Sequence, residues 1–233
     1  MALLSTLAHI ESIAILPRSP ALNPTPTAGD LYALFPAGRD RPGLTPVAPE
    51  EMPEPYRSLL VHTHHMTVTV EGFYGQPVTV TVLDAVRRGD VYGRKILLSL
   101  KETGEVVQFG IIEVDLAALS EHVRAEIVGG KTPLGRVLIQ NDVLRSIRPL
   151  GFYRVELDAA MCLWFGLREP QTTYGRLGVI FTGDRPAIEV LEILAPVSRG
   201  ATDAPLDFVQ SQTNKSSGPL RYTKAPVSVH CST

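Results

Sequence analysis

Apolar and polar residues alternate in several stretches of this chain, and these stretches predict its strands. The clearest are Met66-Thr-Val-Thr-Val70 and Val78-Thr-Val-Thr-Val82, which have a period of two and are rich in β-branched residues. Turn residues between them predict a hairpin. Further strands are expected at 94–100, 106–114, 147–155, 175–182 and 187–194, with two more hairpins that turn at 101–104 and 183–184.

Apolar residues at helical spacing predict three helices that would cover this sheet. Residues 55–61 form one, and residues 116–128 form a second that ends at Gly129-Gly130. The third covers 134–139, with Thr132 as its N-cap and Pro133 in its first turn. Antiparallel hairpins with a few covering helices predict a single α+β domain over about residues 55–198.

The two ends of the chain differ from this central part. Ten of the 19 prolines lie before residue 56, and proline neither continues a helix nor pairs as an internal strand. We therefore expect residues 1–54 to form a proline-rich arm, irregular over 17–53 and anchored through Leu31, Leu34 and Phe35. Residues 199–233 are polar and aperiodic, which predicts a flexible tail.

The composition argues against several classes of protein. The 22 basic and 24 acidic side chains give a net charge of −2, which argues against a main role in gripping nucleic acid or an anionic membrane surface. No run approaches the roughly 20 apolar residues of a membrane span, and residues 1–16 lack the basic start of a signal peptide. The two cysteines, Cys162 and Cys231, are too few for a disulfide framework. We expect a globular protein of the reducing cytoplasm, with Cys162 in its core.

Three patterns that often carry chemistry are incomplete in this chain. His62, His64 and His65 lie close together, but no partner motif accompanies them, so a polar junction between helix and strand is favoured over a metal site. Gly130-Lys-Thr132 lacks the earlier glycine of a phosphate loop, because Ala125 stands there. No Gly-x-Ser-x-Gly segment anchors a hydrolase triad. We therefore expect no metal centre and no phosphate loop.

Two charged residues are notable because they lie in apolar strands. Arg94 opens the strand that contains Ile96 to Leu98, and Glu192 follows Val190 and Leu191 in the last strand. Alternation places Glu192 on the same face as Val190. A carboxylate among apolar neighbours is unfavourable unless it is paired. Arg94 and Glu192 are therefore either a structural ion pair, two charges at the edges of the strands, or the charged groups of a site.

Four blocks of residues form a larger pattern. They are Leu59-Leu-Val-His-Thr-His-His-Met-Thr67, Val91-Tyr-Gly-Arg-Lys-Ile-Leu-Leu98, Gly130-Lys-Thr-Pro-Leu-Gly-Arg136, and Tyr174-Gly-Arg176 with Leu191-Glu-Ile-Leu-Ala-Pro196. In sequence and in order, these blocks resemble the bacterial chorismate pyruvate-lyases over roughly residues 56–197.

The resemblance implies a compact antiparallel sheet of about six strands, with helical flaps that enclose an internal ligand pocket. It implies a lyase that converts chorismate into 4-hydroxybenzoate, or a related hydroxybenzoate, and pyruvate without any cofactor. Position by position, the family's essential arginine and glutamate fall on Arg94 and Glu192, and its substrate-binding methionine and leucine on Met66 and Leu134. The arginine would grip the ring carboxylate, and the glutamate would meet the ring oxygen at the opposite end.

Departures from the family pattern leave the function open. His65 and Gly93 replace a serine and a leucine, and Ile111 stands where an arginine is usual. The chief alternative is a non-catalytic sensor or carrier of an aryl acid, because the ligand-binding domains of one large group of bacterial regulators share this fold. Such regulators carry a winged DNA-binding domain, which an arm without helices or basic clusters cannot form. We expect a small-molecule ligand, no nucleic-acid partner and a monomer.

Overall fold

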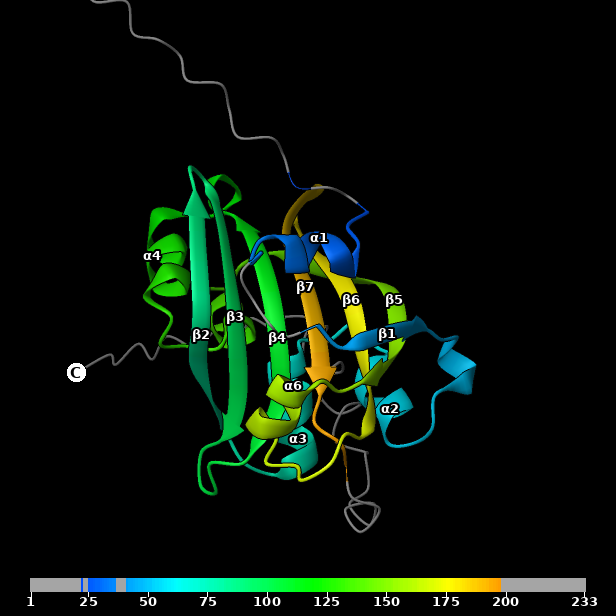
Figure 1. Ribbon diagram of the computed structural model, residues 1–233. Helices are drawn as coiled ribbons and strands as arrows, with labels where there is room; N and C mark the ends of the chain where they lie inside the picture. Colours follow the sequence, from blue (N-terminus) through cyan, green and yellow to red (C-terminus); the bar gives the residue numbers. More distant parts are fainter. Residues whose placement is uncertain (1–21, 23–24, 37–40, 198–233) are drawn as a thin grey trace, which may run out of the picture.

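Seven strands form one open antiparallel sheet. The computed structural model describes it, with its covering helices, over residues 22, 25–36 and 41–197 (Figure 1). The order across the sheet is β1-β5-β6-β7-β4-β3-β2. The strands are β1 (Gly43–Pro46), β2 (Val78–Arg88), β3 (Val91–Leu100), β4 (Val106–Asp115), β5 (Arg145–Glu156), β6 (Thr172–Thr182) and β7 (Arg185–Leu194). The predicted α+β fold with a single antiparallel sheet is confirmed.

Strands that are close in the chain form most of the pairs. β3 pairs with β4 and β6 with β7, as the turns at 101–104 and 183–184 predict. β2 also pairs with β3, and β5 with β6. Two pairs join distant segments, namely β1 with β5 and β4 with β7. The β4–β7 seam places Gly110 opposite Glu192 in the middle of the sheet.

Helices cover both faces of the sheet. They are α1 (Ala28–Ala33), α2 (Tyr56–Leu60), α3 (Met66–Tyr74), α4 (Glu121–Gly129), α5 (Leu134–Gln140) and α6 (Ala159–Trp164), with 3-10 turns η1 (Pro49–Glu51) and η2 (Leu116–Ala118). In Figure 1, α1 and α6 lie in front of the sheet and α4 lies behind it. Alternation sends Phe109 and Leu191 into the layer under α1 and α6, and Ile112 and Val190 into the layer under α4 and α5.

The strand expected at 66–70 is wrong, because these residues form the first half of α3. The extended residue His65 precedes the helix, and Gly75 ends it at a φ of 68°, a left-handed conformation that glycine adopts without strain. Met66 and Val70, one helical turn apart, are buried against the sheet. β-branched residues lower helix propensity only slightly, so this tertiary contact overrides the preference for a strand.

The structure also corrects two other predictions about the helices. Pro133, and not Thr132, occupies the N-cap of α5, which no side chain caps. The helix expected at 116–128 is divided into η2 and α4, which starts after Ser120.

The proline-rich arm is more regular than its composition predicts. Thr27 and Asp30 form a capping box that starts α1, and β1 extends the edge of the sheet beside β5. Leu31 and Phe35 are buried against the sheet, as expected. The expectation of an irregular segment over 17–53 is therefore wrong where α1 and β1 lie.

Several expectations fall on residues outside the described part. These are the flexible tail over 199–233, Cys231 and residues 1–21 of the arm. Cys162, by contrast, is buried in the cluster under α1, as expected. No helix within 25–36 and 41–197 has the length and apolarity required to cross a bilayer.

Candidate functional site

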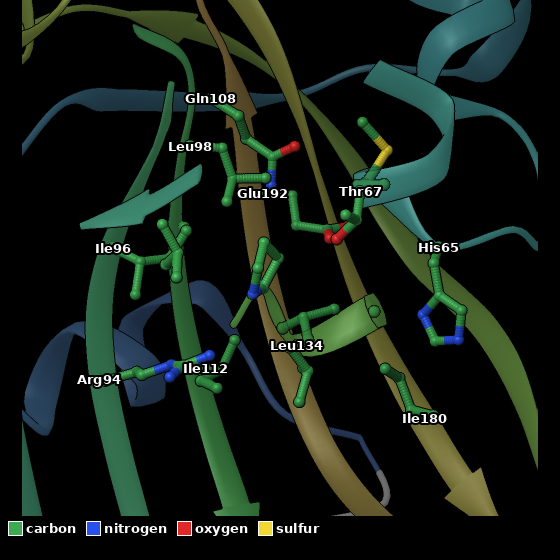
Figure 2. A pocket seen from close by; sticks show the side chains of 16 residues that line it. His65, Thr67, Arg94, Ile96, Leu98, Gln108, Ile112, Leu134, Ile180 and Glu192 are labelled. Atoms are coloured by element: carbon green, nitrogen blue, oxygen red, sulfur yellow. The ribbon is translucent and has the colours of Figure 1, made fainter. Parts of the chain in front are cut away.

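A small cavity of about 40 Å³ lies between the sheet and the first residues of α3 and α5 (Figure 2). β3, β4 and β7 contribute most of its floor, and Met66 and Leu134 belong to the opposite wall. Most of the lining side chains are apolar. The polar side chains are His65, Thr67, Arg94, Gln108 and Glu192.

Two glycines shape this cavity. Gly110 lies in the floor, where a Cβ atom would lie 3.3 Å from the Cδ1 atom of Ile96. Gly135 lies in α5, where a Cβ atom would lie 2.8 Å from Thr67 Oγ1 and 2.9 Å from His65 Cβ. The absence of a side chain at Gly135 therefore allows α5 to approach the start of α3 and close the cavity.

Arg94 is the charged group at one end of the cavity. Its side chain is 1% exposed, and its Nη1 donates to the Ile127 carbonyl at the end of α4 at 2.9 Å. Its Nε is buried and has no hydrogen-bond partner among the described residues, and none of their carboxylates pairs with it. Burial lowers the pKa of the guanidinium, and the Tyr92 hydroxyl opposes this shift. Arg94 is thus a buried cation without a neutralising anion in the described part of the chain.

Glu192, in contrast, already has a charged partner. Arg176 on β6 donates from Nε to Glu192 Oε2 at 2.7 Å. The other donors of Arg176 reach the backbone carbonyls of Leu60, His62 and His64. This ion pair fastens the segment before α3 to the sheet. The sequence-based alternative of a structural pair between Arg94 and Glu192 is therefore wrong.

Gln108 is a third polar group on the floor. It lies on β4 between Leu98 of β3 and Leu194 of β7, and its side chain faces the same cavity. The residue is 3% exposed, and its Oε1 has no hydrogen-bond partner among the described residues. A buried acceptor without a donor is unfavourable, so Gln108 has an unused capacity to accept a hydrogen bond.

His62 and His65, which precede α3, are neutral at pH 7. His62 Nε2 lies 2.8 Å from the Leu59 carbonyl oxygen, and burial together with Arg176 lowers the pKa of this histidine to about 4. Arg145 donates from Nε to His65 Nε2, so the proton of the His65 ring is on Nδ1. Burial, followed by the charge of Arg145, lowers the pKa of His65 to about 4. Within the described residues, no cluster of three His, Cys, Asp or Glu side chains could hold a metal ion.

The start of α3 adds positive potential to the cavity. The first N–H groups of a helix have no partner within it, and they carry a partial positive charge. No side chain caps α3. Met66 and Thr67, its first two residues, line the cavity that Arg94 enters from the sheet. The cavity therefore combines a buried cation with an uncapped helix end, an arrangement that favours an anion.

All four residues assigned through the family resemblance line this one cavity: Met66, Arg94, Leu134 and Glu192. Sequence reasoning missed Arg176 and Gln108. Counting back along the closing hairpin from its turn would have placed Arg176 opposite Leu191, because the irregularity between Ile180 and Phe181, which shifts the register to Glu192, has no signal in the sequence. Gln108 has no comparable signal. Ile111, which replaces a usual arginine, faces the other layer of the protein.

Known proteins offer only a distant likeness. No model of a known protein family matches the chain, and no curated protein sequence matches it. A gene product of Staphylococcus aureus aligns with 50% of this chain and 82% of its own, at 10% identity and a TM-score of 0.39. PhnF from Mycobacterium smegmatis aligns with 58% of this chain and 65% of its own, at 12% identity and a TM-score of 0.41. The C-terminal domain of the histidine utilization repressor from Pseudomonas syringae aligns with 51% and 91%, at 13% identity and a TM-score of 0.36. Likeness at this level assigns no function to the chain.

Proposed function

We propose that this chain binds a small organic carboxylate in the cavity under α3 and α5, with Arg94 as the residue that holds the carboxylate. The observation that carries the proposal is the buried guanidinium of Arg94, which faces the cavity without an anionic partner among the described residues. A buried charge is costly unless it is paired. A carboxylate would pair with it, and the planar guanidinium can bind both carboxylate oxygens.

The volume of the cavity limits the size of the ligand in this conformation. Its 40 Å³ is well below the roughly 150 Å³ of an engineered cavity that binds benzene. An aromatic acid would therefore require the Met66 and Leu134 side chains to move outward, whereas a short aliphatic acid requires less rearrangement. Both residues lie at the first positions of their helices, and Met66 is part of the core, so the movement would displace some of its core contacts.

Titration calorimetry of the full chain with benzoate, 4-hydroxybenzoate and propanoate tests this proposal. Arg94→Met should weaken binding of any acid that binds by about 30-fold or more, because it removes the charged partner of a desolvated carboxylate. Arg94→Lys should restore little, since an ammonium group cannot bind both oxygens. Arg154→Met, at a half-exposed arginine of β5, is the matched control. Equal affinity of Arg94→Met and the unaltered protein would refute the proposal.

Lyase activity on chorismate is the second candidate. It is favoured by the placement of Arg94 and Glu192 at one cavity, which is the arrangement that the family resemblance implies. The Arg176 partner argues against the role of Glu192 in this reaction, because one of its two carboxylate oxygens already accepts a hydrogen bond from Arg176. Incubation with chorismate, followed by chromatography for an aromatic acid and pyruvate, separates the two candidates. If turnover occurs through Glu192, Glu192→Gln should slow it by about 10²–10⁴-fold. Carboxylate binding without any product supports binding alone.

A further inference from the structure

We propose that the cavity selects acids with one carboxylate over acids that carry a second carboxylate at the end remote from Arg94, and that Glu192 makes this distinction. This inference rests on the proposed function and names the class of ligand. It follows from three features of the site: the positions of its two charged side chains, the partner that each already has, and the charge that remains after pairing.

The register of the sheet sets the positions of the two charges. Arg94 on β3 pairs with Ile112 of β4. Glu192 on β7 pairs with Gly110, two residues earlier on β4, so the Cα atoms of Arg94 and Glu192 are separated by roughly 12 Å. Both side chains line the same cavity, and Figure 2 shows Glu192 directed toward Thr67 at the start of α3, away from Arg94. An elongated acid that is held by Arg94 therefore extends toward Glu192.

Glu192 already pairs with the cation at its end of the cavity. Arg176 donates from Nε to Glu192 Oε2 at 2.7 Å, and its Nη atoms donate to backbone carbonyls of the segment before α3. The Arg176 side chain is 2% exposed and is not among the described side chains that line the cavity. A second carboxylate of the ligand would therefore meet the Glu192 anion at this end, and not the Arg176 cation behind it.

Uncharged polar groups have suitable partners at the same end. Gln108 lies one strand and two residues from Glu192, and its carboxamide can both donate and accept a hydrogen bond. The hydroxyl of Thr67 can also do both. A hydroxyl, a carboxamide or a nitro group can each form a hydrogen bond there. This end of the cavity therefore selects the ligand by charge, and not by the kind of hydrogen bond that the ligand forms.

The charges of the site leave one positive charge without a partner. Glu192 and Arg176 cancel each other, and the ring of His65 is neutral at pH 7. Arg145, which donates to His65, is partly exposed to solvent, and this weakens its field in the cavity. Arg94 thus requires one carboxylate. A second carboxylate would lose its hydration next to Glu192, where like charges in contact are strongly unfavourable.

Titration calorimetry of the full chain with isosteric ligands tests this selection. The aromatic set is terephthalate, 4-carbamoylbenzoate and 4-nitrobenzoate, and the shorter aliphatic set is succinate, 4-amino-4-oxobutanoate and 3-nitropropanoate. Within each set, the far group changes from a carboxylate to an uncharged carboxamide or nitro group of nearly the same size. In the set that binds, both monocarboxylates should bind at pH 7 at least about ten-fold more tightly than the dicarboxylate, because only the dicarboxylate brings a second negative charge to Glu192.

Two variants connect the selection to the charge at this end. Glu192→Gln removes the negative charge and keeps an oxygen that can accept from Arg176, whose positive charge is then unpaired. The advantage of the monocarboxylates should fall by about ten-fold or more. Gln108→Lys adds a cation at the same end without altering the ion pair, and should shift the affinity ratio in the same direction. Melting temperatures show whether each variant folds. Glu169→Gln, at an exposed glutamate, is the matched control and should retain the original ratio.

The outcomes separate the inference from the function on which it rests. Equal affinity for a dicarboxylate and its uncharged isosteres, with binding lost in Arg94→Met, would overturn the inference and leave the carboxylate site intact. A selection that persists unchanged in the folded variants would overturn the role of Glu192. A complete absence of carboxylate binding would overturn the proposed function itself.

Discussion

Two buried arginines on the same face of the sheet have opposite roles. Arg176 is satisfied by one carboxylate and three backbone carbonyls, so it stabilises the segment that leads into α3. Arg94 donates to one carbonyl and retains an unpartnered Nε in the described structure. Breaking a satisfied network costs stability, whereas removing an unsatisfied charge can be neutral or stabilising. The unpaired buried charge of Arg94 therefore lowers the stability of the protein without ligand, and a bound carboxylate would offset this loss.

His65 should make the stability of the protein dependent on pH. Burial lowers its pKa to about 4 in the folded chain, against about 6.5 when unfolded, so the unfolded chain takes up more protons between these values. The stabilisation is complete above pH 6.5 and is lost as the pH falls toward 4. Between pH 7 and 4.5, this residue should account for about 2 kcal/mol of the free energy of unfolding.

Urea unfolding at pH 7 and pH 4.5 measures this effect. His65→Gln cannot titrate but can still accept a hydrogen bond from Arg145. The variant should lose less of its free energy of unfolding over this range than the unaltered protein. Parallel losses in the two proteins would contradict the assignment.

The site could be predicted from the sequence only where charge and periodicity coincide. Arg94 and Glu192 interrupt apolar strands, which marks them as buried charges, but both faces of β3 and β7 are buried, so alternation does not say which layer each side chain enters. Whether they contact each other depends on which strands are neighbours, and β4 separates β3 from β7. The role of Gln108 depends on a missing hydrogen-bond partner, which is a property of the folded structure and not of the residue type.

At the scale of elements, the approach of α5 to α3 depends on Gly135. A methyl group there would meet Thr67 and His65 at less than normal contact distance. Gly135→Ala should therefore lower the free energy of unfolding by about 1–3 kcal/mol, because the two helices must separate. Gly129→Ala is the matched control, since a Cβ there meets nothing within 4 Å at the end of α4. Alanine at this helical position should raise stability by about 0.5–1 kcal/mol.

Chemical denaturation of both glycine variants checks this contrast. Benzoate affinity provides a second measurement, because widening the gap between α3 and α5 should change binding in Gly135→Ala alone. Equal stability of the two variants would show that the helices tolerate separation at this point.

The fold was predictable where local turns determine pairing. The hairpins β3–β4 and β6–β7 carry glycine at their turns and long apolar runs in their arms. Residues 66–70 alternate as a strand would, yet their burial at Met66 and Val70 follows a helical turn. α1 and β1 were missed because their stability comes from the sheet beneath or beside them, although the spacing of Thr27 and Asp30 is itself a local signal of a helix start.

At the scale of the whole molecule, the arm contributes to the core. Leu31 of α1 is fully buried among Phe109, Leu191 and other side chains of the sheet. Leu31→Ala should lower the free energy of unfolding by about 2–5 kcal/mol through the cavity that it creates. Leu144→Ala removes the same atoms from a residue that is 82% exposed, and should change stability by less than about 0.5 kcal/mol. Thermal and urea unfolding check both values. If the arm only lay on the surface, Leu31→Ala and Leu144→Ala would both change the free energy of unfolding by similarly small amounts.

The β4–β7 seam has a consequence for the rates of folding. It joins the β2-β3-β4 half to the β5-β6-β7 half across about 80 residues of chain, and pairs so distant in sequence tend to form late. Arg94 and Gln108 lie on one half and Glu192 on the other, so a bound ligand links both. Stopped-flow unfolding should therefore slow in proportion to ligand saturation, while refolding at low denaturant keeps its rate. The bound ligand would thus slow the separation of the two halves of the sheet during unfolding.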